Sequence, residues 1–375
     1  MSSQQRSAGA RSASWLHCRE VGGYGCQSAA RGVDRQGARP GCWPAGRRRS
    51  EGQACRAELD GGGGPAPQIG GDLLAGAEEA RRNLRWSTGT VVENRAASAD
   101  GNVRLMVMSV EDHVDYLEGR KVKRIQKAPR WIDDYKLPGQ FVAVRPLGSD
   151  VSDNEPSPKT WKLLAISSSP YEARRESALL DASIIEILTD RGGEDDILGD
   201  LAPGGQIEVS QALGRGFASL FSSYVGLPSA LEDRRPLLML CAGTPGLSPL
   251  RSVLKWAPVQ ALATTRPIAI VYIAHTPVSA ACLQEWDAWR DMGVKVVTLY
   301  LRQDGDEDVS DGRVKDLLET SIFESNNGLS DLMGGSLAEC AVLMSGLPGS
   351  VATDIANRLA QQGVARERLL FCEFF

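Results

Sequence analysis

The stretch from Leu237 to Leu254, "LLMLCAGTPGLSPLRSVL", combines residue types that can bind a phosphate. An apolar run leads into Gly243-Thr244-Pro245-Gly246, whose glycines let the backbone turn tightly and approach a ligand without interference from a Cβ. Ser248-Pro249 then predicts an N-cap and a first-turn proline, so that free N–H groups of a helix would point toward the turn. The spacing differs from G-x-G-x-x-G and predicts either a pyrophosphate cradle or a structural strand-to-helix turn.

Metal chemistry has little support in the sequence. No two of the eight cysteines have C-x-x-C spacing, and none of His17, His113 and His275 has a second ligand at a useful distance along the chain. We therefore expect no metal site. Four cysteines lie mostly in apolar runs and are expected to be buried free thiols: Cys241, Cys282, Cys340 and Cys372.

The elements around the Gly243–Gly246 turn must position it, and the sequence before the turn predicts a series of short strands. Between about residues 85 and 215, one short helix is expected near Glu194 to Leu201, and polar inserts at 111–136 and 150–159 are expected to be long loops. Short strands in succession predict a six-stranded antiparallel barrel. The six runs are "STGTVVENRA", "NVRLMVMSVE", "GQFVAVRPLG", "TWKLLAISSS", "SIIEILTD" and "GQIEVSQAL".

After Arg235 the pattern changes to alternating strands and helices, with 226–235 as the boundary. This alternation predicts an α/β domain with an open, parallel, five-stranded nucleotide-binding sheet, whose ligands bind at the carboxyl ends of the strands. The expected strands are 236–242, 268–274, 294–301, 340–345 and 368–372, and the expected helices are 248–257, 279–291, 312–321 and 350–362.

Composition separates the first 80 residues from the rest. Residues 1–57 hold ten Arg against three acidic residues, while the whole chain has a net charge of −5. An Arg- and Ser-rich, acid-poor start is typical of an organelle transit segment, although a disordered tail without a targeting function has a similar composition. We expect residues 1–80 to be disordered, with a plastid (chloroplast) destination or, as the alternative, a mitochondrial one. The acidic body argues against nucleic acid as a partner, and no apolar run is long enough to span a bilayer.

The order of the two domains and several motifs resemble the ferredoxin–NADP reductase superfamily, in which a flavin-binding barrel precedes a nicotinamide domain. The loop Gly243 to Pro249 is similar to that superfamily's G-[TG]-G-x-[SA]-P segment, with Pro245 as an insertion. "SPLRS" and "VSQALGRGF" are similar to segments of the plant "fruit protein"-like plastid oxidoreductases. The resemblance covers residues 85–375 and implies a flavin-type barrel at 81–225 and an NAD(P)-binding domain at 236–375.

The resemblance implies a flavin, FAD or FMN, on the barrel. The family's R-x-Y-S strand corresponds to Lys162-Leu163-Leu164-Ala165, followed by Ile166-Ser167. It implies that Lys162 neutralises a phosphate and that Leu164 packs on the flavin ring, while Ala165 replaces a hydrogen-bonding serine and Ser167 follows it. A second flavin element corresponds to Gly192-Gly193, where the carboxylates from Glu194 to Asp196 would repel a diphosphate.

The same resemblance implies a nicotinamide nucleotide on the second domain, with Gly243, Thr244, Gly246 and Ser248 at its phosphates. Thr276 would lie near the adenosine, and Arg302, helped by Arg313, would hold a 2′-phosphate, so that NADP(H) is preferred over NAD(H). Ser345-Gly346 stands where relatives carry Cys-Gly beside the nicotinamide. At the end of the chain, Phe375 would cover the flavin, with Glu373 beside it.

These expectations favour a flavin-dependent NAD(P)H oxidoreductase that transfers hydride between nicotinamide and flavin and electrons to an acceptor of unknown identity. The basic insert from Arg120 to Arg130 either docks a small acidic electron-transfer protein or is a solvated loop. The degenerate flavin motif favours an alternative, a flavin-poor scaffold that acts as a binding or regulatory subunit. A flavin-free dehydrogenase is a third hypothesis, with His275 as its only acid–base candidate.

Overall fold

The computed structural model splits the chain into two units, and the second of them is Pro65–Phe375. All the described residues belong to the second unit, and the expected transit segment lies outside them. The described ranges are 84–118, 121–126, 130–147, 161–180, 182–191, 198–222, 225–302, 311–323, 328–335 and 337–372.

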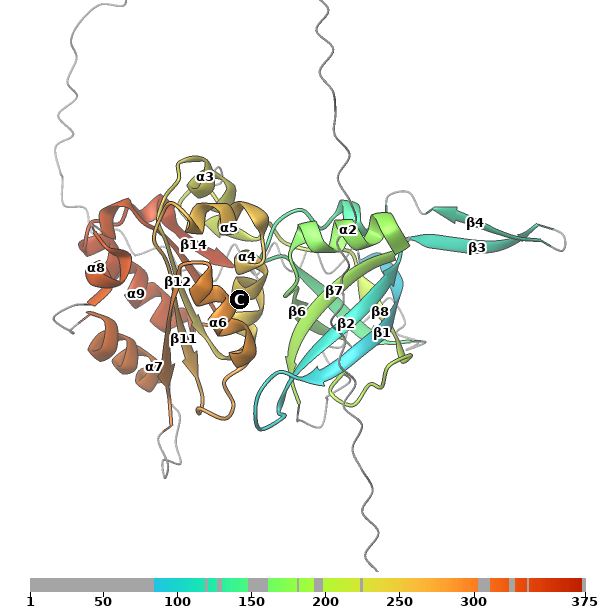
Figure 1. Cartoon of the computed structure of the whole chain (residues 1–375), viewed down its shortest axis with the longest axis horizontal. Helices are drawn as coiled ribbons and strands as arrows, with labels where there is room; N and C mark the ends of the chain where they lie inside the picture. The colour runs from blue at the N-terminus through green and yellow to red at the C-terminus, as the bar shows by residue number, and fades with distance from the viewer. Residues whose placement is uncertain are drawn as a thin grey trace, which may run out of the picture. The chain divides into compact units, whose positions relative to one another are not determined.

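The first half forms the antiparallel barrel that the sequence predicts (Figure 1). Its strand order is β6-β5-β8-β1-β2-β7, and a bridge between Ile166 and Ile187 brings the two end strands together, so that the sheet nearly closes. Apolar residues alternate along the strands and fill the interior, as Ile185 and Ile187 do on β7. The six strands are β1 (Trp86–Ala96), β2 (Val103–Glu111), β5 (Phe141–Pro146), β6 (Lys162–Ala165), β7 (Ala182–Asp190) and β8 (Gln206–Ser210).

The loop expected at 111–136 is in part a β-hairpin, so that expectation was wrong. Strand β3 (His113–Glu118) pairs antiparallel with β4 (Lys121–Gln126) and forms a separate ribbon that projects from the barrel (Figure 1). In β3 polar and apolar residues alternate only from His113 to Tyr116, and in β4 the apolar residues Val122 and Ile125 lie three positions apart, so the sequence carries only a weak strand signal for this hairpin.

A helix that the sequence reasoning missed, α2 (Pro170–Leu180), follows β6. Its start carries a reciprocal capping pair: the amide of Ser169 donates to the Glu172 carboxylate at 3.0 Å, and the amide of Glu172 donates to Ser169 Oγ at 3.3 Å. The S-x-x-E spacing was a readable signal for this helix. Of the helix expected near Glu194 to Leu201, residues 194–197 lie outside the described part, and residues 198–200 form a turn.

The second half contains the five parallel strands that the sequence predicts, in the order β12-β11-β10-β13-β14. The sheet has a sixth strand, however, because β9 (Phe217–Ser219) pairs antiparallel with β14 at its edge. The sheet is therefore mixed and not purely parallel. The parallel strands are β10 (Leu237–Ala242), β11 (Ile268–Ala274), β12 (Val294–Tyr300), β13 (Ala341–Ser345) and β14 (Leu369–Cys372).

Helices cover both faces of this sheet (Figure 1). One face packs against α3 (Leu227–Glu232), α4 (Gly243–Leu254), α5 (Ala257–Ala263) and α6 (Leu283–Asp291). The other packs against α7 (Asp311–Leu318), α8 (Gly328–Met333) and α9 (Gly349–Gln361). In the part of the chain that the structure describes, no helix has the length and apolar character needed to cross a membrane.

Candidate functional site

The candidate site lies where the strand order of the parallel sheet reverses, that is, where the chain has added strands on one side of β10 and then continues on the other side. β10 is the first parallel strand in sequence, and its neighbours are β11 on one side and β13 on the other. In open α/β sheets, ligands bind beyond the carboxyl ends of the two strands that flank this reversal. Here those ends are Ala242 and Ser345, and α4 begins directly after Ala242.

The helix after β10 starts five residues earlier than the sequence suggested. Its N-cap is Ala242, so the residues from Gly243 to Gly246 form the first turn of α4 instead of a loop before it. Ser248 and Pro249 lie inside the helix, and the expectation that they cap it was wrong. Ser248 Oγ instead donates to the carbonyl oxygen of Ala165, 2.8 Å away, and ties the helix to the end of β6.

Two glycines allow this first turn to pack against the end of β13. A Cβ on Gly246 would lie 2.6 Å from the carbonyl oxygen of Ser345, and one on Gly346 would lie 2.3 Å from that of Ala242. Gly346 also has a φ of +67°, which disfavours other residues. Gly243, at φ +64°, is different, because a Cβ there would meet only Pro245 at 3.6 Å. Gly243 thus serves the turn, while Gly246 and Gly346 serve the contact between two backbones.

Ser345 carries a buried hydroxyl without a partner at this place. Its side chain is 2 % exposed, and no residue that the structure describes forms a hydrogen bond with Oγ. Because Ala341 and Leu343 on the same strand face α4, alternation places Ser345 on that side of the sheet too. A buried hydroxyl without a partner is costly and marks a place for a water molecule or a ligand.

A carboxylate from the barrel reaches the first turn of α4. Thr244 Oγ1 donates to Asp190 Oδ1 at 2.5 Å, and Asp190 is the last residue of β7. Thr244 is buried and Asp190 is exposed. This contact joins residues 54 positions apart in the chain, and sequence reasoning did not find Asp190.

The middle of α4 carries the main ionic connection between the barrel and the second sheet. Arg251 is 2 % exposed, and its guanidinium pairs with Glu186 of β7 at 2.5 Å and with Glu285 of α6 at 2.6 Å. Lys255, one turn later, also pairs with Glu186, at 2.8 Å. The segment "SPLRS" therefore contains the residue that holds the barrel against the helix, a role that its spacing alone did not indicate.

The charges in this network stabilise one another. Burial raises the pKa of Glu186, but the positive charges of Arg251 and Lys255 outweigh it and hold that pKa below its ordinary value. Burial lowers the pKa of Arg251, but the hydrogen bonds that it donates to Glu285 and the charge of Glu186 outweigh this and raise the pKa above its ordinary value. Both groups are therefore charged at neutral pH.

The residues expected to bind a flavin lie on β6, on two different faces. Leu164 is buried in the barrel interior with Val142, its partner on β5, and it offers almost no surface to a ring outside. This differs from the expectation that Leu164 covers a flavin. Lys162 lies on the same face, with Nζ 3.5 Å from Thr189 Oγ1. Leu163, half-buried, lies on the opposite, outer face.

The end of β6 on the outer side is covered by α4. Ala165 is 3 % exposed, and its carbonyl oxygen accepts the hydrogen bond from Ser248. Ser167 is fully buried, and its Oγ lies 3.2 Å from Nη1 of Arg251. Four further expected residues lie outside the described part of the chain: Gly192, Gly193, Glu373 and Phe375.

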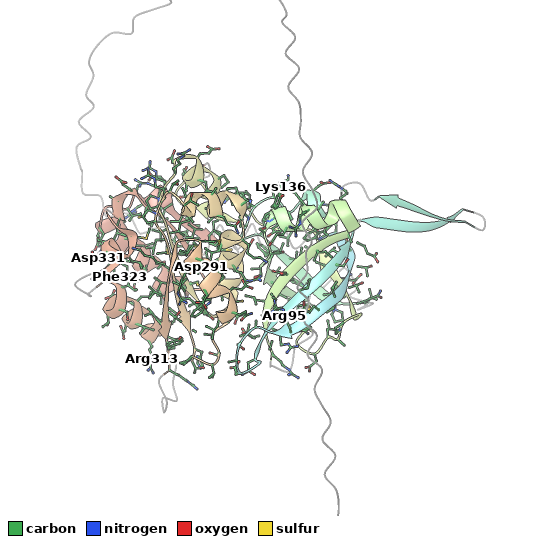
Figure 2. All side chains as sticks on the ribbon, in the orientation of Figure 1. Arg95, Lys136, Asp291, Arg313, Phe323 and Asp331 are labelled. Carbon is green, nitrogen blue, oxygen red and sulfur yellow. The ribbon has the colours of Figure 1, made fainter. Side chains whose placement is uncertain are left out.

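The residues expected near the adenosine gather at the ends of β11 and β12. The amide of Arg302 donates to the carbonyl oxygen of His275 at 2.8 Å, so the two strand ends are adjacent. Thr276 closes a local turn, in which the amide of Ser279 donates to its Oγ1 at 3.2 Å. Arg313, labelled in Figure 2, lies in the first turn of α7 and is half-buried.

The four cysteines expected to be buried free thiols are so in the structure. Among the described residues, no group of His, Cys, Asp and Glu side chains could hold a metal ion.

The chain is similar to reductases of known structure. A ferredoxin-NADP+ reductase from Plasmodium falciparum matches 76% of this chain and 95% of its own, with 14% identity and a TM-score of 0.48. A ferredoxin reductase in carbazole 1,9a-dioxygenase covers 78% of this chain and 70% of its own, with 15% identity and a TM-score of 0.47. The flavohem-like FAD/NAD-binding domain of nitric oxide dioxygenase from Vibrio cholerae covers 76% and 97%, with 16% identity and a TM-score of 0.46.

No protein-family model matches the sequence, and no curated protein sequence matches it significantly. What the described residues establish is a nearly closed antiparallel barrel joined to a mixed α/β sheet with helices on both faces.

Proposed function

We propose that this chain is a flavin-dependent NAD(P)H oxidoreductase, which transfers hydride between nicotinamide and flavin and passes electrons to an acceptor. The observation that carries the proposal is the buried, unpartnered hydroxyl of Ser345 at the sheet reversal, beside the first turn of α4. A helix N-terminus, a tight glycine contact and a free hydroxyl meet there, and together they suit a nucleotide.

The residues present fit the nicotinamide nucleotide. The first turn of α4 has no side-chain cap, so its N–H groups are available for phosphate oxygens. Thr244 would add a hydroxyl, and Ser345 would find in the nicotinamide the partner that it lacks. In this proposal Ser345 orients the ring, and Gly346 lets the end of β13 pack against the first turn of α4 beside it. Arg302 and Arg313 would hold a 2′-phosphate, which is why NADP(H) is proposed over NAD(H).

The residues fit a flavin only in part, and the fit involves a shift of one position along β6. In a strand, neighbouring residues face opposite sides, so Leu163 and not Leu164 would meet a ring on the outer face. A bound flavin, FAD or FMN, would supply the hydride acceptor at this face. The chain would contribute an apolar contact through Leu163 and a dry boundary through the buried end of β6 at Ala165.

Several finer assignments belong to the same proposal. Phe375 would cover the flavin and move aside for nicotinamide, with Glu373 beside it, and Gly192-Gly193 would approach the flavin phosphates. The basic insert from Arg120 to Arg130 would attract a small acidic electron-transfer protein. The composition of residues 1–80 supports a plastid or mitochondrial location. The "SPLRS" and "VSQALGRGF" segments support a relationship to the "fruit protein"-like oxidoreductases.

An absorbance spectrum of the purified full-length protein tests the proposal. We expect a flavin spectrum, directly or after reconstitution with FAD or FMN, that is bleached by NADPH faster than by NADH. Leu163→Ala should weaken flavin retention more than Leu147→Ala, a change at an exposed leucine elsewhere on the barrel. A preparation that stays colourless after reconstitution would contradict the proposal and favour the flavin-poor binding scaffold.

A further inference from the structure

The contact between Asp190 and Thr244 brings a negative charge to the place where a nucleotide phosphate is expected. Thr244 is the second residue of α4, and its hydroxyl donates to the Asp190 carboxylate at 2.5 Å. The carboxylate is therefore bonded to the Thr244 hydroxyl, and no Lys or Arg in the described part of the chain is paired with it.

The same physical features that attract a phosphate to this turn also attract a carboxylate. The N-terminus of a helix carries a partial positive charge and free N–H groups, and α4 has no side-chain cap of its own. The unpartnered Ser345 hydroxyl, 2 % exposed and on the α4 side of the sheet, independently indicates that a ligand belongs at this end. Asp190 and a phosphate are thus two anions that fit one position.

We propose that Asp190 is an internal anion that occupies the phosphate position at the first turn of α4 and that an incoming nucleotide must displace it. The inference rests on the proposed nucleotide site. Because Asp190 ends β7 of the barrel and Thr244 lies in the first turn of α4 in the second half, the contact also closes the junction between the barrel and the α/β half at this point. Displacing Asp190 would therefore open the junction as the nucleotide enters.

The test is equilibrium binding to the full-length protein of three probes: NADP+, NAD+ and inorganic pyrophosphate. Asp190→Asn keeps the size of the side chain and removes its charge. Asp331→Asn removes an equal charge from α8, which packs on the opposite face of the sheet, and is the matched control. Asp190→Ser removes the same charge with a smaller side chain and replaces the Asn variant if that variant misfolds.

We expect Asp190→Asn to bind pyrophosphate and NADP+ about tenfold more tightly at low salt, because repulsion between two anions within a few ångströms is removed. The gain should shrink as the salt concentration rises, and Asp331→Asn should behave as the wild type does. Equal or weaker binding by both Asp190 variants would overturn the inference, since Asp190 would then not compete with the ligand for this position.

The two proposals fail in different ways. If no variant and no wild-type protein binds NADP+ or NAD+, the proposed function fails. The pyrophosphate measurement then still decides about Asp190: tighter binding in Asp190→Asn supports the internal anion, and unchanged binding contradicts it.

Discussion

Arg251 and Glu186 form an ion pair of 2.5 Å between α4 and β7, at the boundary of the barrel and the second sheet. The arginine is almost fully buried, so water does not compete for its hydrogen bonds as it does at a surface ion pair. Its partner on the other side, Glu285, completes a bridge from the barrel through α4 to α6. The orientation of α4, and with it the position of the first turn at the candidate site, depends on this bridge.

Removing the guanidinium should destabilise the protein strongly. Arg251→Met leaves the carboxylates of Glu186 and Glu285 without their shared cation, and breaking a buried pair costs about 3–5 kcal/mol. Denaturant unfolding measures this loss. Arg290→Met, which removes an exposed pair with Asp287, is the matched control and should cost less than about 1 kcal/mol. A loss for Arg251→Met as small as that of the control would show that the bridge does not stabilise the fold.

The bridge should also make stability depend on pH on the acid side. The pKa of Glu186 in the folded protein lies below its ordinary value of 4.5, so its contribution is complete above that value. The contribution is lost as the pH falls through the lower, folded-state pKa. We expect the free energy of unfolding of the wild type to fall more steeply between about pH 5 and pH 3 than that of Glu186→Gln. If the free energy of unfolding of the two proteins fell equally with pH, the ion pair of Glu186 would not be the source of this acid sensitivity.

The glycine contact between α4 and β13 can be tested by adding a single methyl group. Gly346→Ala would place a Cβ 2.3 Å from the carbonyl oxygen of Ala242 at a positive φ. We expect a loss of about 2–4 kcal/mol in the free energy of unfolding. Gly335→Ala is the control, because nothing lies within 4 Å of the added atom. Equal stability of the two variants would mean that the first turn of α4 can move away from β13 at little cost.

Ser345 should affect the free protein and the reaction in opposite directions. Ser345→Ala removes a buried hydroxyl without a partner and should leave stability unchanged or raise it by about 1 kcal/mol. If the hydroxyl meets the nicotinamide, the same variant should oxidise NADPH more slowly, and Ser345→Cys should restore part of the rate. Thermal unfolding and stopped-flow absorbance are the two measurements. An unchanged rate would remove Ser345 from the site.

The thiols should be slow to react in the folded protein. Burial raises the pKa of Cys282 to about 12 and that of Cys340 to about 11, and only the thiolate reacts readily with alkylating agents. Alkylation at pH 8, followed by peptide-resolved mass spectrometry, should show little modification of either residue until denaturant is added. Rapid labelling of Cys282 in the native protein would contradict its buried position.

The sequence predicts the elements of this fold better than it predicts their contacts. The six barrel strands and the five parallel strands can be predicted because alternating apolar residues indicate half-buried strands and continuous apolar runs indicate fully buried ones. The start of α4 is not visible, because glycines usually end helices, and only the approach of Ser345 and Gly346 explains Gly246. The strand β9 is missed for a related reason, since three residues carry no periodic signal.

The candidate site is only partly predictable for a physical reason. Gly243, Thr244 and Ser345 can be named because strand ends and glycine turns have local signatures. Asp190 and Arg251 cannot, because their partners lie 54 and 65 positions away along the chain. The face on which Leu164 lies depends on where β6 enters the sheet, and a one-residue error in that register reverses the assignment.

The edge strand β9 has a consequence for any attempt to take the protein apart. It precedes the boundary at 226–235 in sequence but completes the second sheet by pairing with β14. A fragment that begins at residue 236 would therefore leave one side of β14 with unpaired backbone groups, an open edge that strands of other copies can join. We expect such a fragment to aggregate, whereas one that begins before Phe217 retains the strand that protects this edge.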